Sequence, residues 1–151
     1  MCVDAFIRNS ANHNTGVEVN VMSINFRSIV QDDYESVRQF LSEVGWEQRV
    51  SDRDQFKKLM DNSSRTVVAD EQGRIVGFAR ALCDEVSNGY ISMVAVAPDK
   101  REQGLGRELV QRLIGDDVDI TWVLRAGRES GDFWRKIGFV HSEIAMEKLR
   151  A

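Results

Sequence analysis

Residues 94–107 read VAVAPDKREQGLGR, and the other elements can be placed outward from this segment. The run Tyr90–Ala97 is almost continuously apolar, which predicts a central strand buried on both faces. Pro98, the single proline of the chain, cannot extend a strand ladder, so the strand should end there. A charged loop with two glycines follows, and leucines at helical spacing predict a helix over Gly104–Ile114.

The predicted elements on either side alternate between helices and strands. Strands are expected near 24–29 and over Arg65–Ala69, Arg74–Cys83, Asp119–Leu124, Phe139–Glu143 and Ala145–Leu149. Helices are expected over 32–45, capped by Asp32 and ended by Gly45, over Asp52–Met60, capped by Ser51, and over Ser130–Ile137. The order βααβββαβαββ predicts an α/β fold, in which helices flank a mixed, mostly antiparallel sheet that ends in a closing hairpin.

The composition limits the classes of protein to which the chain can belong. Its 151 residues suit one domain, and 42% hydrophobic residues can fill a core. Residues 1–21 are polar and lack a period, so we expect a flexible arm there and one domain over 22–151. No apolar run could span a membrane, no signal-peptide pattern opens the sequence, and the two cysteines and two histidines lie far apart. These features predict a cytoplasmic protein without a metal site.

The loop before the Gly104 helix has the features of a phosphate site. Gly104 and Gly106 lack a Cβ atom, so a ligand can approach the backbone, and the first turn of a helix presents unpaired N–H groups. Segments 99–112 and 125–136 carry net charges of +1 and +2, so the rest of the −4 chain carries −7. This asymmetry predicts an anionic cofactor on one side and a cationic acceptor on the other. The alternative is a helix start that binds no ligand.

Two motifs resemble the acetyl-CoA signature of the GNAT superfamily of N-acetyltransferases. The pattern R-x-x-G-x-G at 101–106 is similar to the family's Q/R-x-x-G-x-G/A motif, and FWRKIGF at 133–139 is similar to its F-Y-x-K-L-G-F segment. The resemblance covers about 24–149 and implies the GNAT fold, with acetyl-CoA as cosubstrate. It implies that strand backbone binds the pantetheine arm and that the loop holds the pyrophosphate. The implied cofactor-binding residues are Val94, Ala95, Val96, Arg101, Glu102, Gln103, Gly104, Leu105, Gly106, Arg107, Phe133 and Trp134.

Two positions depart from the family pattern. Trp134 stands where many members have a tyrosine that is thought to protonate the leaving thiolate, and an indole is no acid near neutral pH. Gly127 lies about where many members have an asparagine that contacts the cofactor. The tyrosine's role therefore does not carry over to Trp134, and Tyr90 and Ser92 become candidate donors to the thiolate.

A base that accepts a proton from the acceptor amine is predicted where the Arg74–Cys83 strand ends. Asp84 and Glu85 are the candidate catalytic carboxylates, and the alternative is that they serve only the turn they occupy. Glu35 and Glu47, on the side that covers the acceptor site in the family, are further candidates.

These inferences together predict an enzyme. We expect an N-acetyltransferase in which a primary amine, small or part of a protein, attacks acetyl-CoA directly without an acyl-enzyme. The acceptor is expected to be cationic, with no nucleic acid or membrane as partner, and a homodimer is left open. A non-catalytic module that binds or senses acyl-CoA is the rival, because of Trp134. A nucleotide-phosphate binder is a third interpretation, although no metal-binding Ser, Thr or Asp accompanies the glycines.

Overall fold

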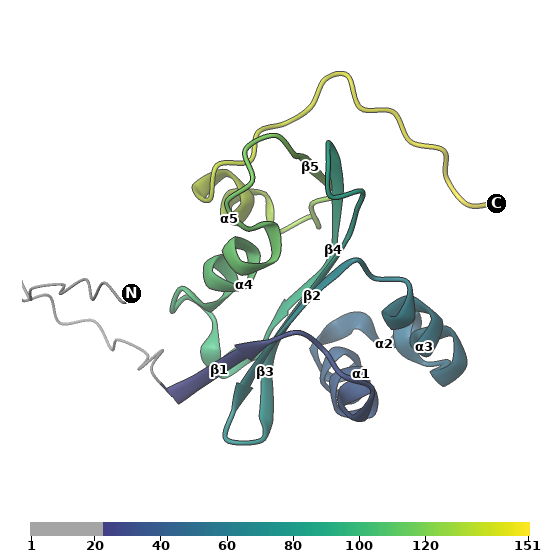
Figure 1. The fold of residues 1–151 in the computed structure, drawn as a ribbon, viewed down its shortest axis with the longest axis vertical. Helices are drawn as coiled ribbons and strands as arrows, with labels where there is room; N and C mark the ends of the chain where they lie inside the picture. The colour runs from purple at the N-terminus through teal and green to yellow at the C-terminus, as the bar shows by residue number, and fades with distance from the viewer. Residues whose placement is uncertain (1–22) are drawn as a thin grey trace, which may run out of the picture.

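The structure is a computed structural model that describes residues 23–151, and the arm predicted over 1–21 lies outside the described residues. Five strands form one sheet in the order β1-β2-β3-β4-β5 (Figure 1). Neighbouring strands are antiparallel, except that β4 and β5 are parallel. The predicted α/β class with a mixed, mostly antiparallel sheet is therefore confirmed. The strands are β1 (Ile24–Arg27), β2 (Arg65–Glu71), β3 (Arg74–Cys83), β4 (Asn88–Val96) and β5 (Thr121–Leu124).

Helices cover both faces of the sheet, with α1, α2 and α3 on one side and α4 and α5 on the other (Figure 1). Their apolar stripes fill the core: Leu109 and Leu113 of α4 and Leu41 of α1 are fully or almost fully buried. The helices are α1 (Tyr34–Leu41), α2 (Glu47–Val50), α3 (Arg53–Asp61), α4 (Leu105–Ile114) and α5 (Gly131–Lys136). Short 3-10 or π turns cover Gln31–Asp33, Ser42–Trp46 and Pro98–Lys100.

The prediction that the Tyr90–Ala97 strand is central and buried on both faces is wrong. The middle strand is β3, where residues 76–81 are all buried. Burial alternates along β4, with Ile91, Met93 and Ala95 in the core and the residues between them partly or fully exposed. The less buried residues of β4, Tyr90, Ser92 and Val94, are therefore accessible enough to line a site.

Helix boundaries differ from the predictions at three positions. Asp52 caps α3 instead of Ser51, because its carboxylate accepts a hydrogen bond from the N–H of Gln55 at 2.9 Å. α1 begins after Asp33, one residue beyond the predicted cap. Gly45 interrupts the helical path with φ +100, but the chain re-enters a helix as α2, which buries Val50. Four residues are too few to show a period in the sequence.

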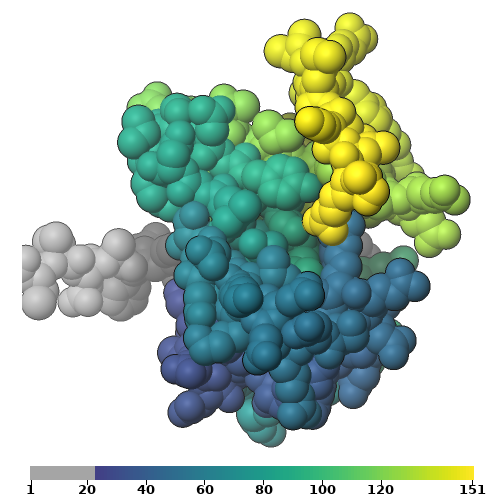
Figure 2. All heavy atoms as spheres, turned by 90° about the vertical axis from the view of Figure 1, so that its right-hand side faces the viewer, coloured from purple at the N-terminus to yellow at the C-terminus, as the bar shows by residue number. Residues whose placement is uncertain are grey.

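The predicted closing hairpin over Phe139–Glu143 and Ala145–Leu149 is wrong, because the structure has no strand after β5 in the part it describes. The alternating apolar residues of this segment stay exposed: Val140, Ile144, Met146 and Leu149. Alternation of apolar and polar residues indicates a tendency to form a strand. The strand forms only where a partner strand and a buried face are available. Figure 2 shows the segment, in yellow, lying across the front of the molecule, where Glu147 pairs with Arg125 at 2.9 Å.

Candidate active site

β4 pairs with β5 along only part of its own length, whereas all four residues of β5 are paired. Their register runs from Asn88 opposite Thr121 to Ile91 opposite Leu124. Two residues farther along β4, Met93 has φ +56, where the β3–β4 register also shifts. Such a bulge bends the strand. β4 therefore diverges from β5, and residues 92–96 of β4 have no strand partner on that edge.

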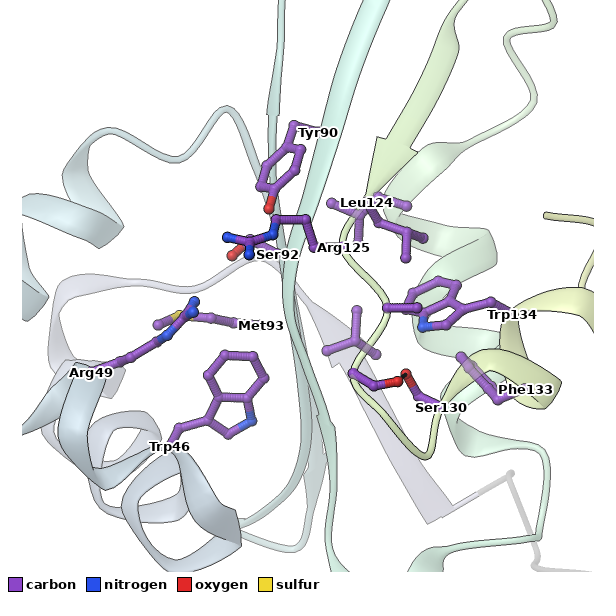
Figure 3. A pocket seen from close by; sticks show the side chains of 14 residues that line it. Trp46, Arg49, Tyr90, Ser92, Met93, Leu124, Arg125, Ser130, Phe133 and Trp134 are labelled. Carbon is purple, nitrogen blue, oxygen red and sulfur yellow. Dashed lines mark hydrogen bonds between the residues drawn. The ribbon is translucent and has the colours of Figure 1, made fainter. Parts of the chain in front are cut away.

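A cavity of about 460 Å³ lies at this divergence, and we call it the β4–β5 cavity (Figure 3). Its wall on the α5 side is aromatic, since the ring of Trp134 packs edge-on against Phe133 and Phe139 at centroid distances of 5.0 and 5.2 Å. Trp46 and Arg49 approach from the opposite side of β4 (Figure 3). The lining residues are Trp46, Arg49, Tyr90, Ile91, Ser92, Met93, Val94, Leu124, Arg125, Ala126, Gly127, Ser130, Phe133 and Trp134.

The glycine loop and the start of α4 adjoin this opening. Gly104 precedes α4 with φ +87, in the left-handed region that favours glycine. The backbone N–H groups of Leu105, Gly106 and Arg107 have no acceptor among residues 23–151. A Cβ atom on Gly106 would lie 3.1 Å from the ring of Phe133, so loop and aromatic wall are in close contact. The two sequence motifs thus meet in space.

The predicted pantetheine-binding residues of β4 differ in their surroundings. Val94 lines the β4–β5 cavity. Ala95 points into the core and is 7% exposed, so only its backbone could face a ligand. The carbonyl oxygen of Val96 accepts a hydrogen bond from Nε of Arg101 at 3.2 Å, which links the strand to the loop.

Asp84 and Glu85 lie in the turn between β3 and β4, and neither lines the β4–β5 cavity. The Asp84 carboxylate accepts hydrogen bonds from the N–H groups of Ser87, Asn88 and Val86 and from the Ser87 hydroxyl. These bonds hold the pKa of Asp84 well below its usual range, which weakens it as a base. The pKa of Glu85 is also lowered, because Glu85 pairs with Arg65. The base role stays a prediction, and these bonds favour the alternative role in the turn.

Asp84→Asn is expected to make the stability of the protein less dependent on pH. The carboxyl pKa is lower in the folded than in the unfolded chain, so its stabilising effect is complete above pH ~4 and is lost as the pH falls. The variant should have a lower Tm than wild type at pH 7, and the gap should shrink at pH 3. Asp116→Asn, at an exposed carboxylate, is the control for thermal denaturation at both pH values. A gap that is unchanged at pH 3 would contradict the role in the turn.

The other predicted groups lie apart from the cavity. Glu35 pairs with Arg38 and Arg53, and Glu47 is exposed on α2 without lining the cavity. In contrast, Tyr90 and Ser92 do line the cavity, as the role of thiolate donor requires.

Three arginines at or next to this site were not predicted from the sequence: Arg49 and Arg125 line the β4–β5 cavity, and Arg80 lies beside it. Arg49 lies on α2, Arg80 lies on β3 opposite Ser92, and Arg125 directly follows β5. They come from segments far apart in the chain, so no local motif contains them. One signal was present: Arg80 is the charged residue inside the apolar run IVGFARALC, and it is 6% exposed.

Comparisons with known proteins agree with this geometry. Residues 31–148 match the model of the GNAT acetyltransferase domain. The uncharacterized N-acetyltransferase ycf52 of Gracilaria tenuistipitata var. liui is 32% identical over 133 residues, which are 83% of this chain and 70% of that protein. The chain therefore belongs to the GNAT family of acetyltransferases and is an acyltransferase.

Solved structures share the fold. A probable acetyltransferase of Staphylococcus aureus superposes with a TM-score of 0.71 at 16% identity, covering 85% of this chain and 98% of the other. A predicted acetyltransferase of Clostridium acetobutylicum, solved with acetyl-CoA, superposes with a TM-score of 0.60 at 19% identity, covering 83% and 96%.

Among residues 23–151, no helix is long and apolar enough to cross a membrane. No group of three or more His, Cys, Asp or Glu side chains in the same range is placed to hold a metal ion.

Proposed function

We propose that this protein transfers the acetyl group of acetyl-CoA to a primary amine, on a small molecule or a protein, by direct attack in a ternary complex. The observation that carries the proposal is the divergence of β4 from β5 beside the first turn of α4. This arrangement offers free strand backbone along one edge and unpaired N–H groups at a helix start. A ligand with an amide-containing arm and a pyrophosphate end fits both features, and the related Clostridium protein was solved with acetyl-CoA.

The residues around the opening suit each part of acetyl-CoA. The edge of β4 at Val94 and Val96 would bind the pantetheine arm as an added strand. The N–H groups of the loop Arg101–Arg107 would hold the pyrophosphate, where the helix dipole favours negative charge. Phe133 and Trp134 would pack against the thioester end.

The chemistry requires a stabilised leaving group. The amine nitrogen attacks the carbonyl carbon, the C–S bond breaks, and the amine gives up a proton to solvent. A thiol with a pKa of about 8.5 can leave as a thiolate when donors surround it. Tyr90 and Ser92 line the cavity and each carries a hydroxyl, and Trp134, which carries an indole N–H, lines it as well. These three side chains are our candidate donors.

Replacing Trp134 tests both the enzyme and its rival, the acyl-CoA sensor. We expect wild type to release free thiol from acetyl-CoA with at least one member of a broad amine panel. Trp134→Tyr keeps a donor and should change the rate by less than about tenfold, whereas Trp134→Phe removes the donor and should lose more. Tight acetyl-CoA binding with no transfer in wild type, and transfer gained in Trp134→Tyr, would instead support the sensor.

A further inference from the structure

A second cavity adjoins the β4–β5 cavity on the side of α2 and α3. It has a volume of about 730 Å³ and shares Arg49, Tyr90, Ser92, Met93 and Arg125 with the first cavity. We call it the arginine cavity. Because the two cavities share these lining residues, a molecule in the arginine cavity would lie next to the thioester end of the β4–β5 cavity.

The charges that line the arginine cavity have one sign. Its cationic residues are Arg49, Lys58, Arg80, Arg125 and Arg150. No aspartate or glutamate is among the described residues that line it. One carboxylate reaches its rim, where Glu147 of the C-terminal segment pairs with Arg125. That pair shows that a carboxylate can reach Arg125.

Arg80 is the strongest sign that the cavity receives a ligand. The residue is 6% exposed, yet no carboxylate among the described residues pairs with it. Its guanidinium donates one hydrogen bond, from Nε to the Ser63 hydroxyl at 2.8 Å, and Nη1 and Nη2 have no acceptor in residues 23–151. Burial lowers the pKa of Arg80, because removing a charge from water disfavours it. Because neither Nη atom is fully buried, both can meet an anion in the cavity, and an anion there would compensate the largely buried charge.

Resting on the proposed function, we propose that the acceptor is an amine that also carries an anionic group, a carboxylate or a phosphate, which the Arg49, Arg80 and Arg125 guanidiniums bind. This reverses the cationic acceptor expected from the net charges of segments, because the charges that matter are those that line the cavity. A guanidinium fork matches the geometry of either anion.

The same cationic residues affect how the acceptor amine can lose its proton without a catalytic carboxylate in the cavity. Cations near an ammonium favour its neutral form, and the neutral amine is the nucleophile. The anionic group would hold the acceptor against this repulsion, while its amine points toward the thioester. An acceptor of this class would therefore reach its reactive form without a catalytic carboxylate in the cavity.

The test compares acceptors that differ only in the anion. Thiol release is measured in two matched pairs: β-alanine against propylamine, and O-phosphoethanolamine against ethanolamine. The panel also contains the standard amino acids, and spermidine and a lysine peptide as cationic acceptors. We expect kcat/KM to be at least about tenfold higher for the anionic member of a pair. The carboxylate and phosphate pairs show which anion is preferred.

Arginine variants assign the effect to the cavity. Arg125→Gln and Arg80→Gln should lower kcat/KM for the anionic acceptor by about 10- to 100-fold and change that for its neutral partner much less. Arg53→Gln, on α3 and outside the cavity, should change neither. Arg80→Met should keep or raise the Tm, since it removes a buried unpaired charge. A lower Tm with equal losses for both acceptors would indicate a structural role and overturn the proposal.

The other outcomes separate this inference from the proposed function. If kcat/KM is higher for spermidine or the lysine peptide, or does not depend on the anionic group, the proposal of an anionic acceptor is wrong. The proposed acetyltransferase activity would still stand. Acetyl-CoA binding without transfer to any amine of the panel would overturn the proposed function and this inference with it.

Discussion

Gly104→Asp is expected to abolish measurable binding of acetyl-CoA, whereas Gly104→Asn retains it. The carboxylate would lie beside the N–H groups that we assign to the pyrophosphate, and repulsion between close charges at an effective dielectric of about 20 amounts to roughly 4 kcal/mol. A loss of at least about 100-fold in affinity should follow. Titration calorimetry of both variants with acetyl-CoA measures it.

The asparagine variant controls for backbone strain. Gly104 has φ +87, a conformation that strains any side chain, although Asn and Asp tolerate it better than most residues. No atom lies within 4 Å of the new Cβ, so both variants meet the same open space and the same strain. Their difference in affinity therefore reports charge. If Asn weakens binding as much as Asp, the phosphates do not bind at this loop.

Gly89→Ala is expected to lower the free energy of unfolding by about 1–3 kcal/mol, the usual cost of forcing an atom into a filled space. The added Cβ would lie 2.2 Å from the ring of Trp122, which is opposite Gly89 in the β4–β5 register. The ring must move, and the short pairing that closes one end of the cavity moves with it. Urea denaturation gives the stability, and acetyl-CoA affinity should fall as well.

A double-mutant cycle identifies the cause. In a Trp122→Ala background, Gly89→Ala should cost less than half of its value in wild type, because the ring it displaces is gone. Gly127→Ala is the matched glycine control, since its Cβ would make only an ordinary contact with the Ser130 hydroxyl at 3.6 Å. Equal costs in both backgrounds would show that Trp122 does not constrain position 89.

The elements that sequence patterns predicted well are those whose signal is local. The β2–β3 hairpin and α4 appear where alternation, helical spacing and the flanking glycines indicated. The predicted closing hairpin has the same alternation, but it is absent from the part of the chain that the structure describes, because its strands have no partner there. A strand needs a neighbour, and the choice of neighbour is not a local property.

For the site, the sequence alone determined the glycine loop at the start of α4 and the aromatic pair Phe133 and Trp134, because each motif lies within a few consecutive residues. Only the tertiary structure decided that β4 diverges from β5 and that Arg49, Arg80 and Arg125 share a cavity. These features depend on strand register and on side chains from distant segments. Packing brings those segments together, so the sign of the charge that lines the arginine cavity is a property of the folded chain.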